Sequence, residues 1–497
     1  MFNLNHALRF LIPVLLCTGV QSAHPEPAAA RKMNVLFIAV DDMRPELGCY
    51  GNPLIKSPNI DQLAKNGLQF NHAYCQFALC NPSRSSLLSG RRPESIQVFD
   101  LKTFLRKNNP DIVTLPELFK NNGYTSLSFG KIFHTTNGNH EDKKSWSEPA
   151  WKNDVPKTPP QDAASSNSEE RAADPDPDGS DHSNDMPYGA PDVADEELID
   201  GKIARAAIAA MDSHATQPLF LGVGFHRPHM PFIAPKHYWD LYDPAQIKLA
   251  PNPFLPNDAP AFASNDASEL RRYKGVAKTG PPVTDEEART LIQGYYASIS
   301  YVDTLVGKLL AELDRLKLRE NTIIVLWGDH GYQLGEHATW NKRTDWEIAT
   351  RVPLIISYPG QKTRGAKCDA LVEFVDMYPT LAGMCGLPLP EKLEGTSFQP
   401  LLEKPDLRWK RAAFSIYHKA IPKLGGESDG RAMRTARYRF IEWKASDPQS
   451  TQTVRELYDD QVDPQENTNI ANKPENQKLV QELTEQLHAG WKAAVPR

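Results

Sequence analysis

The residues from Cys80 to Arg84 have the types and the spacing for nucleophilic chemistry on an anion. They read Cys-Asn-Pro-Ser-Arg. Proline is favoured in the first turn of a helix, and the backbone N–H groups at a helix start bind anions. Arg84 would add a permanent positive charge beside the Cys80 side chain. Taken alone, the segment also suits an ordinary buried cysteine at a helix start, so other residues have to decide between the two interpretations.

Acidic and imidazole side chains follow two apolar runs of the chain. Asp41 and Asp42 end the run 34–40, and Asp329 and His330 end a second run. Each pair alone is typical of turn or capping residues. Bringing three carboxylates together would be costly without a cation, and oxygen-rich ligands suit Ca²⁺, with Mg²⁺ or Mn²⁺ less favoured. The two pairs together therefore predict a metal site.

Four further basic side chains follow apolar runs or lie just downstream of Asp329. They are Lys131, His134, His229 and Lys342. A single lysine or histidine on a loop is usually solvated. The joint placement is more specific, because ligands of parallel sheets bind at the carboxyl ends of the strands.

Strand-like runs alternate with helical patterns over most of the chain. Capping boxes at Thr114–Glu117 and Thr284–Glu287 open two helices, and the second continues to about Leu316. The apolar runs are 34–40, 124–129, 218–225, 322–328 and 353–358. This alternation predicts an α/β fold with a large mixed, mostly parallel sheet sandwiched by helices.

Two segments depart from this alternation. Residues 140–197 are rich in Asp, Pro, Ser and Asn, which predicts a long surface insertion. Its acidic start around Asp174 resembles an EF-hand loop but lacks a preceding apolar helix, which favours a solvated loop. After about Pro400, short alternating runs and a final helical pattern predict a smaller C-terminal α+β subdomain with an antiparallel sheet, at 406–497.

The N-terminus predicts an exported protein. Arg9 precedes an apolar run at 10–20 that ends in small residues. About 11 apolar residues are too few to span a bilayer, so residues 1–23 are predicted to be a signal peptide and the protein to be secreted or periplasmic, with no membrane span. The 56 Lys+Arg nearly balance the 62 Asp+Glu among 497 residues, which excludes a basic nucleic-acid platform.

Five cysteines follow the predicted signal peptide, at positions 49, 75, 80, 368 and 385. An odd number in an exported protein means that at least one is unpaired or modified. Pairing of Cys368 with Cys385 stays open. Cys75 and Cys80 are too far apart in sequence for a C-x-x-C redox motif, so redox function ranks last among the hypotheses.

The segment from Cys80 to Arg91 resembles the C-x-P-S-R-x-x-x-L-x-x-G-R signature of the formylglycine-dependent (type I) sulfatase family, position by position. The resemblance runs from about Asn34 to the C-terminal segment ELYDDQVDPQENTNIA. It implies an alkaline-phosphatase-like fold with a catalytic domain at 32–405. Segments such as GKIFH, GFHRPHMPF and LGEHATWNK look closest to iduronate-2-sulfatase and its bacterial relatives.

The resemblance implies a role for each candidate residue. A formylglycine-generating maturation enzyme would oxidise Cys80 to formylglycine (3-oxoalanine), whose hydrate supplies the nucleophile. One calcium ion would be bound by five residues, namely Asp41, Asp42, modified Cys80, Asp329 and His330. The catalytic residues would be completed by Arg84, Lys131, His134, His229 and Lys342. Of these, Lys131, His229 and Lys342 would also bind the substrate. His229 would protonate the leaving group, and His134 would take a proton from the formylglycine hydrate.

The implied reaction is hydrolysis of a sulfate monoester of a carbohydrate, such as a glycosaminoglycan or algal polysaccharide fragment. Arg227 and Lys419 are further candidates for contact with a sugar carboxylate. Two alternatives stay open, a phosphomonoester or phosphonate hydrolase and an inactive sulfoglycan-binding protein. Parallel assays on aryl sulfate and aryl phosphate would distinguish a sulfatase from a phosphomonoester or phosphonate hydrolase. Sulfoglycan binding by protein that lacks the formylglycine aldehyde would identify the inactive binding protein.

Overall fold

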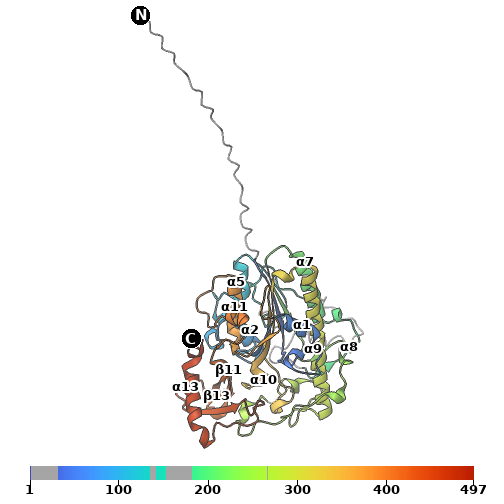
Figure 1. The fold of residues 1–497 in the computed structure, drawn as a ribbon. Helices are drawn as coiled ribbons and strands as arrows, with labels where there is room; N and C mark the ends of the chain where they lie inside the picture. The colour runs from blue at the N-terminus through green and yellow to red at the C-terminus, as the bar shows by residue number, and fades with distance from the viewer. Residues whose placement is uncertain (2–31, 135–140, 153–181, 266, 497) are drawn as a thin grey trace. The chain divides into compact units, whose positions relative to one another are not determined.

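An eight-stranded sheet forms the centre of the computed structural model (Figure 1). The structure describes residues 1, 32–134, 141–152, 182–265 and 267–496. Contacts divide the chain into two units, residues 1–32 and 33–497, and the sheets and helices belong to the second. The predicted signal peptide, apart from Met1, and the EF-hand-like segment at Asp174 lie outside the described residues.

The order of strands in this sheet is β10-β2-β8-β7-β1-β5-β3, with β9 beside β2. Most pairs are parallel, including β1 with both β5 and β7, whereas β8 runs antiparallel to β2 and β7. The mixed, mostly parallel sheet is therefore confirmed. The strands are β1 (Asn34–Val40), β2 (Leu68–Tyr74), β3 (Thr125–Gly130), β5 (Leu219–Phe225), β7 (Thr322–Gly328), β8 (Arg351–Ser357), β9 (Ala366–Cys368) and β10 (Val372–Glu373).

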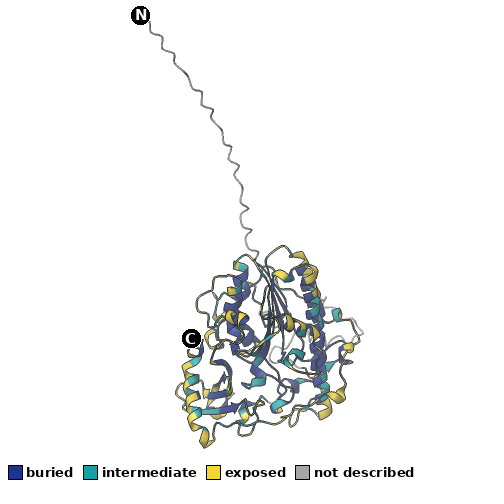
Figure 2. Ribbon diagram, viewed as in Figure 1, coloured by how far each residue is buried: buried dark blue, intermediate teal, exposed yellow. Residues whose placement is uncertain are grey.

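Helices cover both faces of the sheet because its central strands are apolar on both faces. In β1, Leu36, Ile38 and Val40 pack against one group of helices, and Val35 and Phe37 against the other. The first group comprises α1 (Pro58–Asn66), α7 (Ile199–Ser213) and α9 (Asp285–Arg315). The second comprises α2 (Cys80–Ser89), α5 (Leu115–Asn121) and α11 (Met377–Met384). Figure 2 shows the strands as the buried layer between them.

The helix starts agree with the local sequence. Thr114 and Thr284 each form the expected capping box, with Glu117 and Glu287. The remaining helices are α3 (Pro93–Ile96), α4 (Leu105–Asn108), α8 (Lys236–Trp239), α10 (Glu347–Thr350) and α12 (Gln399–Glu403). The 3-10 helices are Gly48–Tyr50, Asp195–Glu197, Pro244–Gln246, Ala261–Ala263, Leu270–Arg272, Arg319–Asn321, Glu336–Ala338, Phe374–Asp376, Pro422–Leu424 and Pro474–Asn476.

The C-terminal part contains the expected antiparallel sheet and terminal helix. The sheet comprises β11 (Ala412–Ile421), β12 (Gly426–Thr435), β13 (Tyr438–Ala445) and β14 (Thr453–Asp459), followed by α13 (Gln477–Ala494). One run of the sequence, 433–443, is divided by a turn between β12 and β13. The boundary at residue 405 stays a prediction. Within the described residues, no helix has the length and apolar character to cross a membrane.

The expected surface insertion is partly built into the fold. Asp142 is buried and accepts hydrogen bonds from Arg106, and Trp146 is buried against Phe133. Farther along, β4 (Tyr188–Gly189) pairs with β6 (Phe232–Ile233). Polar composition identified an irregular segment, but it did not predict these anchoring contacts.

Candidate active site

Asp41 and Asp42 lie where β1 ends, and both are fully buried. Asp41 accepts hydrogen bonds from Arg84 (Nη2 to Oδ1, 3.0 Å) and from Lys131. Burial alone would raise the pKa of Asp41, but Lys131 and Arg84 hold it well below its usual value. Asp42 has a φ of 58°, a left-handed conformation that is uncommon outside glycine and marks a constrained position.

Cys80 is the first residue of α2, and its side chain points toward the end of β7. Its Sγ lies 3.2 Å from Nε2 of His330, while the other ring nitrogen of His330 lies 2.9 Å from the carbonyl oxygen of Gly331. That carbonyl can only accept, so Nδ1 carries the proton and Nε2 is free to accept or to ligate. Burial raises the pKa of the Cys80 thiol well above its usual value. Unmodified Cys80 is therefore not a ready thiolate nucleophile.

Four of the five predicted metal ligands form one buried cluster. Ligand atoms of Asp41, Asp42, Cys80 and His330 all lie within 4.8 Å of one another. Asp329 adjoins the cluster, with Oδ2 at 3.6 Å from His330 Nε2 and Oδ1 accepting from the Asp42 backbone at 3.0 Å. Burial and neighbouring carboxylates raise the pKa of Asp42 well above its usual value despite Lys342. Such crowding of carboxylates is what a bound hard cation relieves, so the donor set suits Ca²⁺.

Arg84 connects α2 to three strand ends. Its Nε donates to Asp329 at 2.9 Å, its Nη2 to Asp41, and its Nη1 to the carbonyl oxygens of Lys131 and Ile132. The guanidinium is fully buried. Arg84 therefore fixes the positions of two predicted metal ligands rather than facing an open pocket.

Lys131 and His134 follow β3, as the sequence indicated. Gly130 has a φ of 73°, and a Cβ there would lie 2.1 Å from the carbonyl oxygen of Gly224, so only glycine permits this turn. Burial alone would lower the pKa of Lys131, but Asp41 raises it, so the side chain stays charged. Both ring nitrogens of His134 are buried without a hydrogen-bond partner among the described residues. Burial and Lys131 lower its pKa well below the usual value, which suits a proton acceptor.

His229 belongs to a loop after β5 that Asp200 of α7 holds in place. Asp200 accepts from the backbone N–H groups of His226 (2.8 Å) and Arg227 (2.9 Å). Nδ1 of His229 donates to the carbonyl oxygen of Met230 at 2.7 Å, which aims Nε2 into the site. Burial and Lys342 lower the pKa of His229 well below its usual value, so the ring is neutral before a substrate binds.

Lys342 reaches the same place from the loop after β7. Its Nζ lies 3.1 and 2.9 Å from the two carboxylate oxygens of Asp42 and 3.1 Å from Glu269 Oε2. Glu269 also faces His229, with Oε1 3.3 Å from Nε2. The sequence reasoning missed Glu269, because it lies in an irregular polar segment and in none of the compared motifs.

Arg227 and Lys419 do not present free charges to a ligand. Arg227 donates to the carbonyl oxygens of Ile233 (3.1 Å) and His229 (3.2 Å). Lys419 donates to the carbonyl oxygen of Phe262 and lies over the Trp443 ring at 5.0 Å. Both residues hold loops near the site, so the sugar-carboxylate hypothesis has no support from their geometry.

The cysteines after residue 32 are all free thiols, at positions 49, 75, 80, 368 and 385. Cys368 and Cys385 therefore form no disulfide in this structure. The Cys368 thiol instead donates to the carbonyl oxygen of Pro405 at 3.2 Å.

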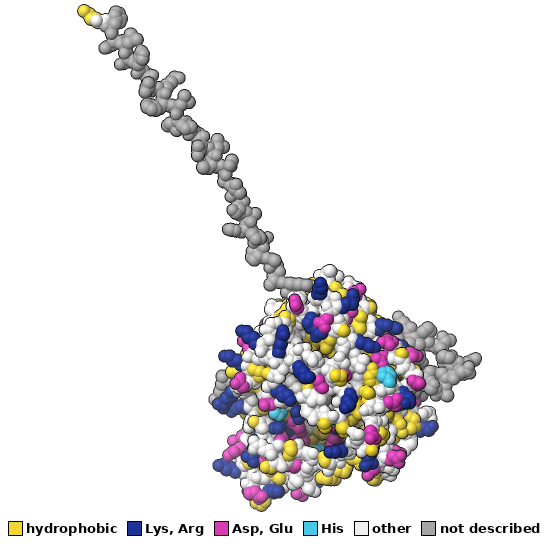
Figure 3. Space-filling model, turned by 45° about the vertical axis from the view of Figure 1, so that its right-hand side comes forward, with side chains coloured by type: hydrophobic (Ala, Val, Ile, Leu, Met, Phe, Trp, Pro, Cys, Tyr) yellow, Lys and Arg dark blue, Asp and Glu magenta, His cyan; other side chains and the backbone are white. Residues whose placement is uncertain are grey.

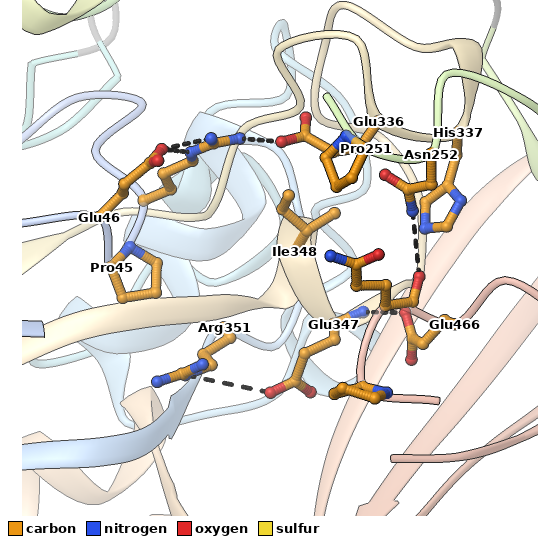
Figure 4. A pocket seen from close by; sticks show the side chains of 13 residues that line it. Pro45, Glu46, Pro251, Asn252, Glu336, His337, Glu347, Ile348, Arg351 and Glu466 are labelled. Carbon is orange, nitrogen blue, oxygen red and sulfur yellow. Dashed lines mark hydrogen bonds and ion pairs between the residues drawn. The ribbon is translucent and has the colours of Figure 1, made fainter. Parts of the chain in front are cut away.

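A separate cavity of about 280 Å³ lies beside the loops that carry the site (Figure 4). Arg44 lines this cavity. In Figure 4, Glu46 and Glu336 lie on one side of it and Glu347 and Glu466 on the other. Arg44 is paired with Glu336 at 2.9 Å and with Glu46. None of the predicted catalytic or metal residues lines this cavity, so it is not the reaction centre.

The surface carries no extended field of one charge on the face drawn in Figure 3. Lys and Arg side chains are interspersed there with Asp and Glu. This mixture on the drawn face agrees with the nearly balanced composition of the chain.

Comparisons with known proteins cover nearly the whole chain. A family model described as sulfatase matches residues 33–387, and one described as N-sulphoglucosamine sulphohydrolase, C-terminal, matches residues 335–492. Iduronate 2-sulfatase of Mus musculus is 34% identical, over 94% of this chain and 96% of its own. The ulvan-active sulfatase of Formosa agariphila is 27% identical, over 97% and 85%.

A solved structure shares the fold. The phosphonate monoester hydrolase SpPMH from Silicibacter pomeroyi superimposes with a TM-score of 0.71 at 23% identity, covering 93% of this chain and 96% of that one. At this identity the likeness concerns the arrangement of the sheet and helices, and it carries no statement about the substrate.

Proposed function

The chain belongs to the sulfatase family and is a sulfuric ester hydrolase, as the Cys80 signature indicated. On this premise, we propose that it removes sulfate from a carbohydrate through a formylglycine made from Cys80. The observation that carries the proposal is one buried cluster. It places the Cys80 side chain among four carboxyl-end loops that bring Asp41, Lys131, His229 and His330 together.

Formylglycine is required because the unmodified thiol is a poor nucleophile in this position. Burial keeps the thiol protonated. When present, the hydrated aldehyde supplies one hydroxyl for attack on sulfur and a second whose deprotonation allows sulfate to leave. Oxidation of Cys80 implies a formylglycine-generating maturation enzyme as a partner.

A hard cation would be held by Asp41, Asp42, Asp329 and His330 together with the side chain at position 80. Calcium is the proposed ion because carboxylate oxygens dominate the set. When bound, the ion withdraws charge from sulfate oxygens and favours an ionised hydroxyl at position 80.

The chain's own side chains would bind the sulfate and move protons. Lys131 and Lys342 stay protonated and supply positive charge to the sulfate oxygens. His134 has a lowered pKa and would accept the proton of the second hydroxyl. His229 Nε2 would protonate the leaving oxygen, once the ring has gained a second proton in the presence of the anionic substrate.

The proposed substrate class rests on the relatives. Those with matches over most of their length include an iduronate 2-sulfatase and an ulvan-active sulfatase, so the proposed substrate is a sulfated glycosaminoglycan or algal polysaccharide fragment. The signal-peptide sequence at 1–23 supports action in the periplasm or outside the cell, where such polysaccharides occur.

Mass spectrometry of the peptide that contains Cys80 is the direct test. Protein produced together with a formylglycine-generating enzyme should carry an aldehyde at this position and should hydrolyse aryl sulfate faster than aryl phosphate. Faster phosphate hydrolysis would favour the alternative of a phosphomonoester or phosphonate hydrolase, and a phosphonate monoester hydrolase is among the solved structures with this fold. A thiol that stays unmodified beside a matured control sulfatase, with sulfoglycan binding retained, would favour the inactive binding protein.

A further inference from the structure

Glu269 is a fourth buried carboxylate at the site, outside the predicted catalytic and metal-binding set. It lies just before the 3-10 helix Leu270–Arg272 and is 6% exposed. Its carboxylate lies 3.1 Å from Lys342 Nζ and 3.3 Å from His229 Nε2. An anion pocket that contains a carboxylate calls for an explanation, because negative charge opposes the binding of negative substrates.

The loop that carries Glu269 is fixed to the loop that carries Lys342. Ser264 Oγ lies 3.0 Å from Thr339 Oγ1, and Asn341 Nδ2 donates to Ser268 Oγ at 3.1 Å. Leu270 is fully buried in the main core. Both sides of the Glu269–Lys342 pair are therefore held by structure and not by the ion pair alone.

A second metal ion does not explain this carboxylate. Ligand atoms of Asp42, His229 and Glu269 lie within 4.8 Å of one another. However, Lys342 Nζ already contacts both carboxylates, at 2.9 Å from Asp42 and 3.1 Å from Glu269. Its ammonium group supplies the positive charge that a cation would bring.

Glu269 lowers the net formal charge of the site by one unit. The cations are Arg84, Lys131 and Lys342, and the carboxylates are Asp41, Asp42, Asp329 and Glu269. With one divalent cation, neutral histidines and a hydroxyl at position 80 that has not yet ionised, these residues leave the site a single net positive charge. A sulfate monoester has one negative charge, whereas a phosphate monoester has close to two above its second pKa of about 6. Without Glu269, the site would match the phosphate instead.

We propose that Glu269 is a specificity-determining residue that reduces the positive charge around Lys342, so that the pocket favours a singly charged sulfate ester over a doubly charged phosphate ester. This inference rests on the proposed function of the same site. Glu269 would disfavour the phosphate ester by charge repulsion, and repulsive elements of this kind often determine specificity.

The test compares matured, metal-loaded wild type with Glu269→Gln, Glu269→Asp and the control Glu336→Gln. Glu336 is likewise a carboxylate paired with a basic side chain, Arg44, but it lines the separate cavity of Figure 4. Aryl sulfate and aryl phosphate hydrolysis are measured near pH 8, together with calorimetric binding of inorganic phosphate and the metal content. Glu269→Gln should raise the phosphate-to-sulfate ratio of kcat/KM by about tenfold or more and tighten phosphate binding. Glu269→Asp and Glu336→Gln should keep the wild-type ratio.

An unchanged ratio and unchanged phosphate affinity in Glu269→Gln, at wild-type metal content, would overturn the inference, and so would an equal shift in Glu336→Gln. If Glu269→Gln does not fold, inhibition of the wild-type enzyme by the two anions provides the test of charge selection. The inhibition constant of methyl phosphate is measured against that of methyl sulfate at two pH values. Methyl phosphate should be the relatively stronger inhibitor at about pH 5, where it is a monoanion, and the weaker one at about pH 8, where it is a dianion. The reverse order would contradict the inference. Wild type without sulfatase activity would contradict the proposed function, while the binding measurements would still test Glu269.

Discussion

Arg84 and Asp41 form an ion pair between Nη2 and Oδ1 at 3.0 Å, with both side chains completely buried. The same guanidinium holds Asp329 at 2.9 Å. The first helix turn after Cys80 is thereby tied to the ends of β1 and β7. Burying such charges costs several kcal/mol per ion before their attraction is counted, so this arrangement is explained better by the geometry of the site than by stability.

Arg84→Lys should therefore disrupt the site while keeping its charge. A lysine cannot reach Asp41, Asp329 and the backbone carbonyls at once, because it lacks the planar, forked donor set. We expect kcat/KM for aryl sulfate to fall by roughly a hundredfold or more. Steady-state kinetics on protein with confirmed formylglycine content would check this. Wild-type activity in Arg84→Lys would mean that charge alone is required.

Asp42→Asn should remove metal binding with little change to the backbone. Asn tolerates the left-handed conformation of Asp42, whose φ is 58°, about as well as Asp does. The substitution removes one of the charged oxygen ligands that the proposed Ca²⁺ requires. We expect the calcium content, measured by elemental analysis, to fall together with activity, and chelation of wild type to have the same effect in a calcium-reversible manner. Full calcium content in Asp42→Asn would contradict the proposed ligand set.

The clustering of the candidate site residues was predictable from the sequence because most of them follow the ends of parallel strands. Asp41, His229 and Asp329 follow β1, β5 and β7, whose burial on both faces produces continuous apolar runs. Lys131 follows β3, in which buried serines alternate with Leu127 and Phe129. Parallel pairing of these strands then brings their carboxyl ends together. Local patterns and topology therefore pointed to the same cluster.

Features that depend on long-range pairing were not predictable in this way. The strand at 353–358 was expected, but its antiparallel direction as β8 depends on the path of the loop after β7. The sequence of β2 includes Asn71 and His72 and lacks a continuous apolar run. Glu269 is in an irregular loop, and only the fold brings it to the site, through contacts with His229 and with Lys342, 73 positions later.

His229→Ala should discriminate between substrates by their leaving groups. A nitrophenolate leaves without protonation, whereas a sugar alkoxide requires a proton, which His229 Nε2 is placed to supply. We expect losses of roughly 100- to 1000-fold on sugar or alkyl sulfates and about tenfold or less on nitrophenyl sulfate. Kinetics across a series of leaving groups measure this difference. Equal losses on all substrates would instead assign His229 to substrate binding.

Glu373, the last residue of β10, should make stability depend on acid pH. Its buried carboxylate lies 2.9 Å from Arg92 and 2.7 Å from Lys410, and it accepts from the Phe414 backbone at 2.9 Å. Burial alone would raise its pKa, but Arg92 and Lys410 lower it from 4.5 to about 2. The folded state therefore keeps this group ionised at a pH where the unfolded chain protonates it.

The resulting stabilisation is fully present above about pH 4.5 and is lost as the pH falls toward about 2. Glu373→Gln should lower the stability at neutral pH by about 2 kcal/mol, because the buried Arg92 and Lys410 side chains lose this ion-pair partner. The gap in melting temperature between wild type and variant should narrow as the pH is lowered below 4.5. Glu391→Gln is the control, since Glu391 is exposed and its loss should change neither value. A gap that stays constant or widens with acidity would show that the ionised carboxylate is not the stabilising form.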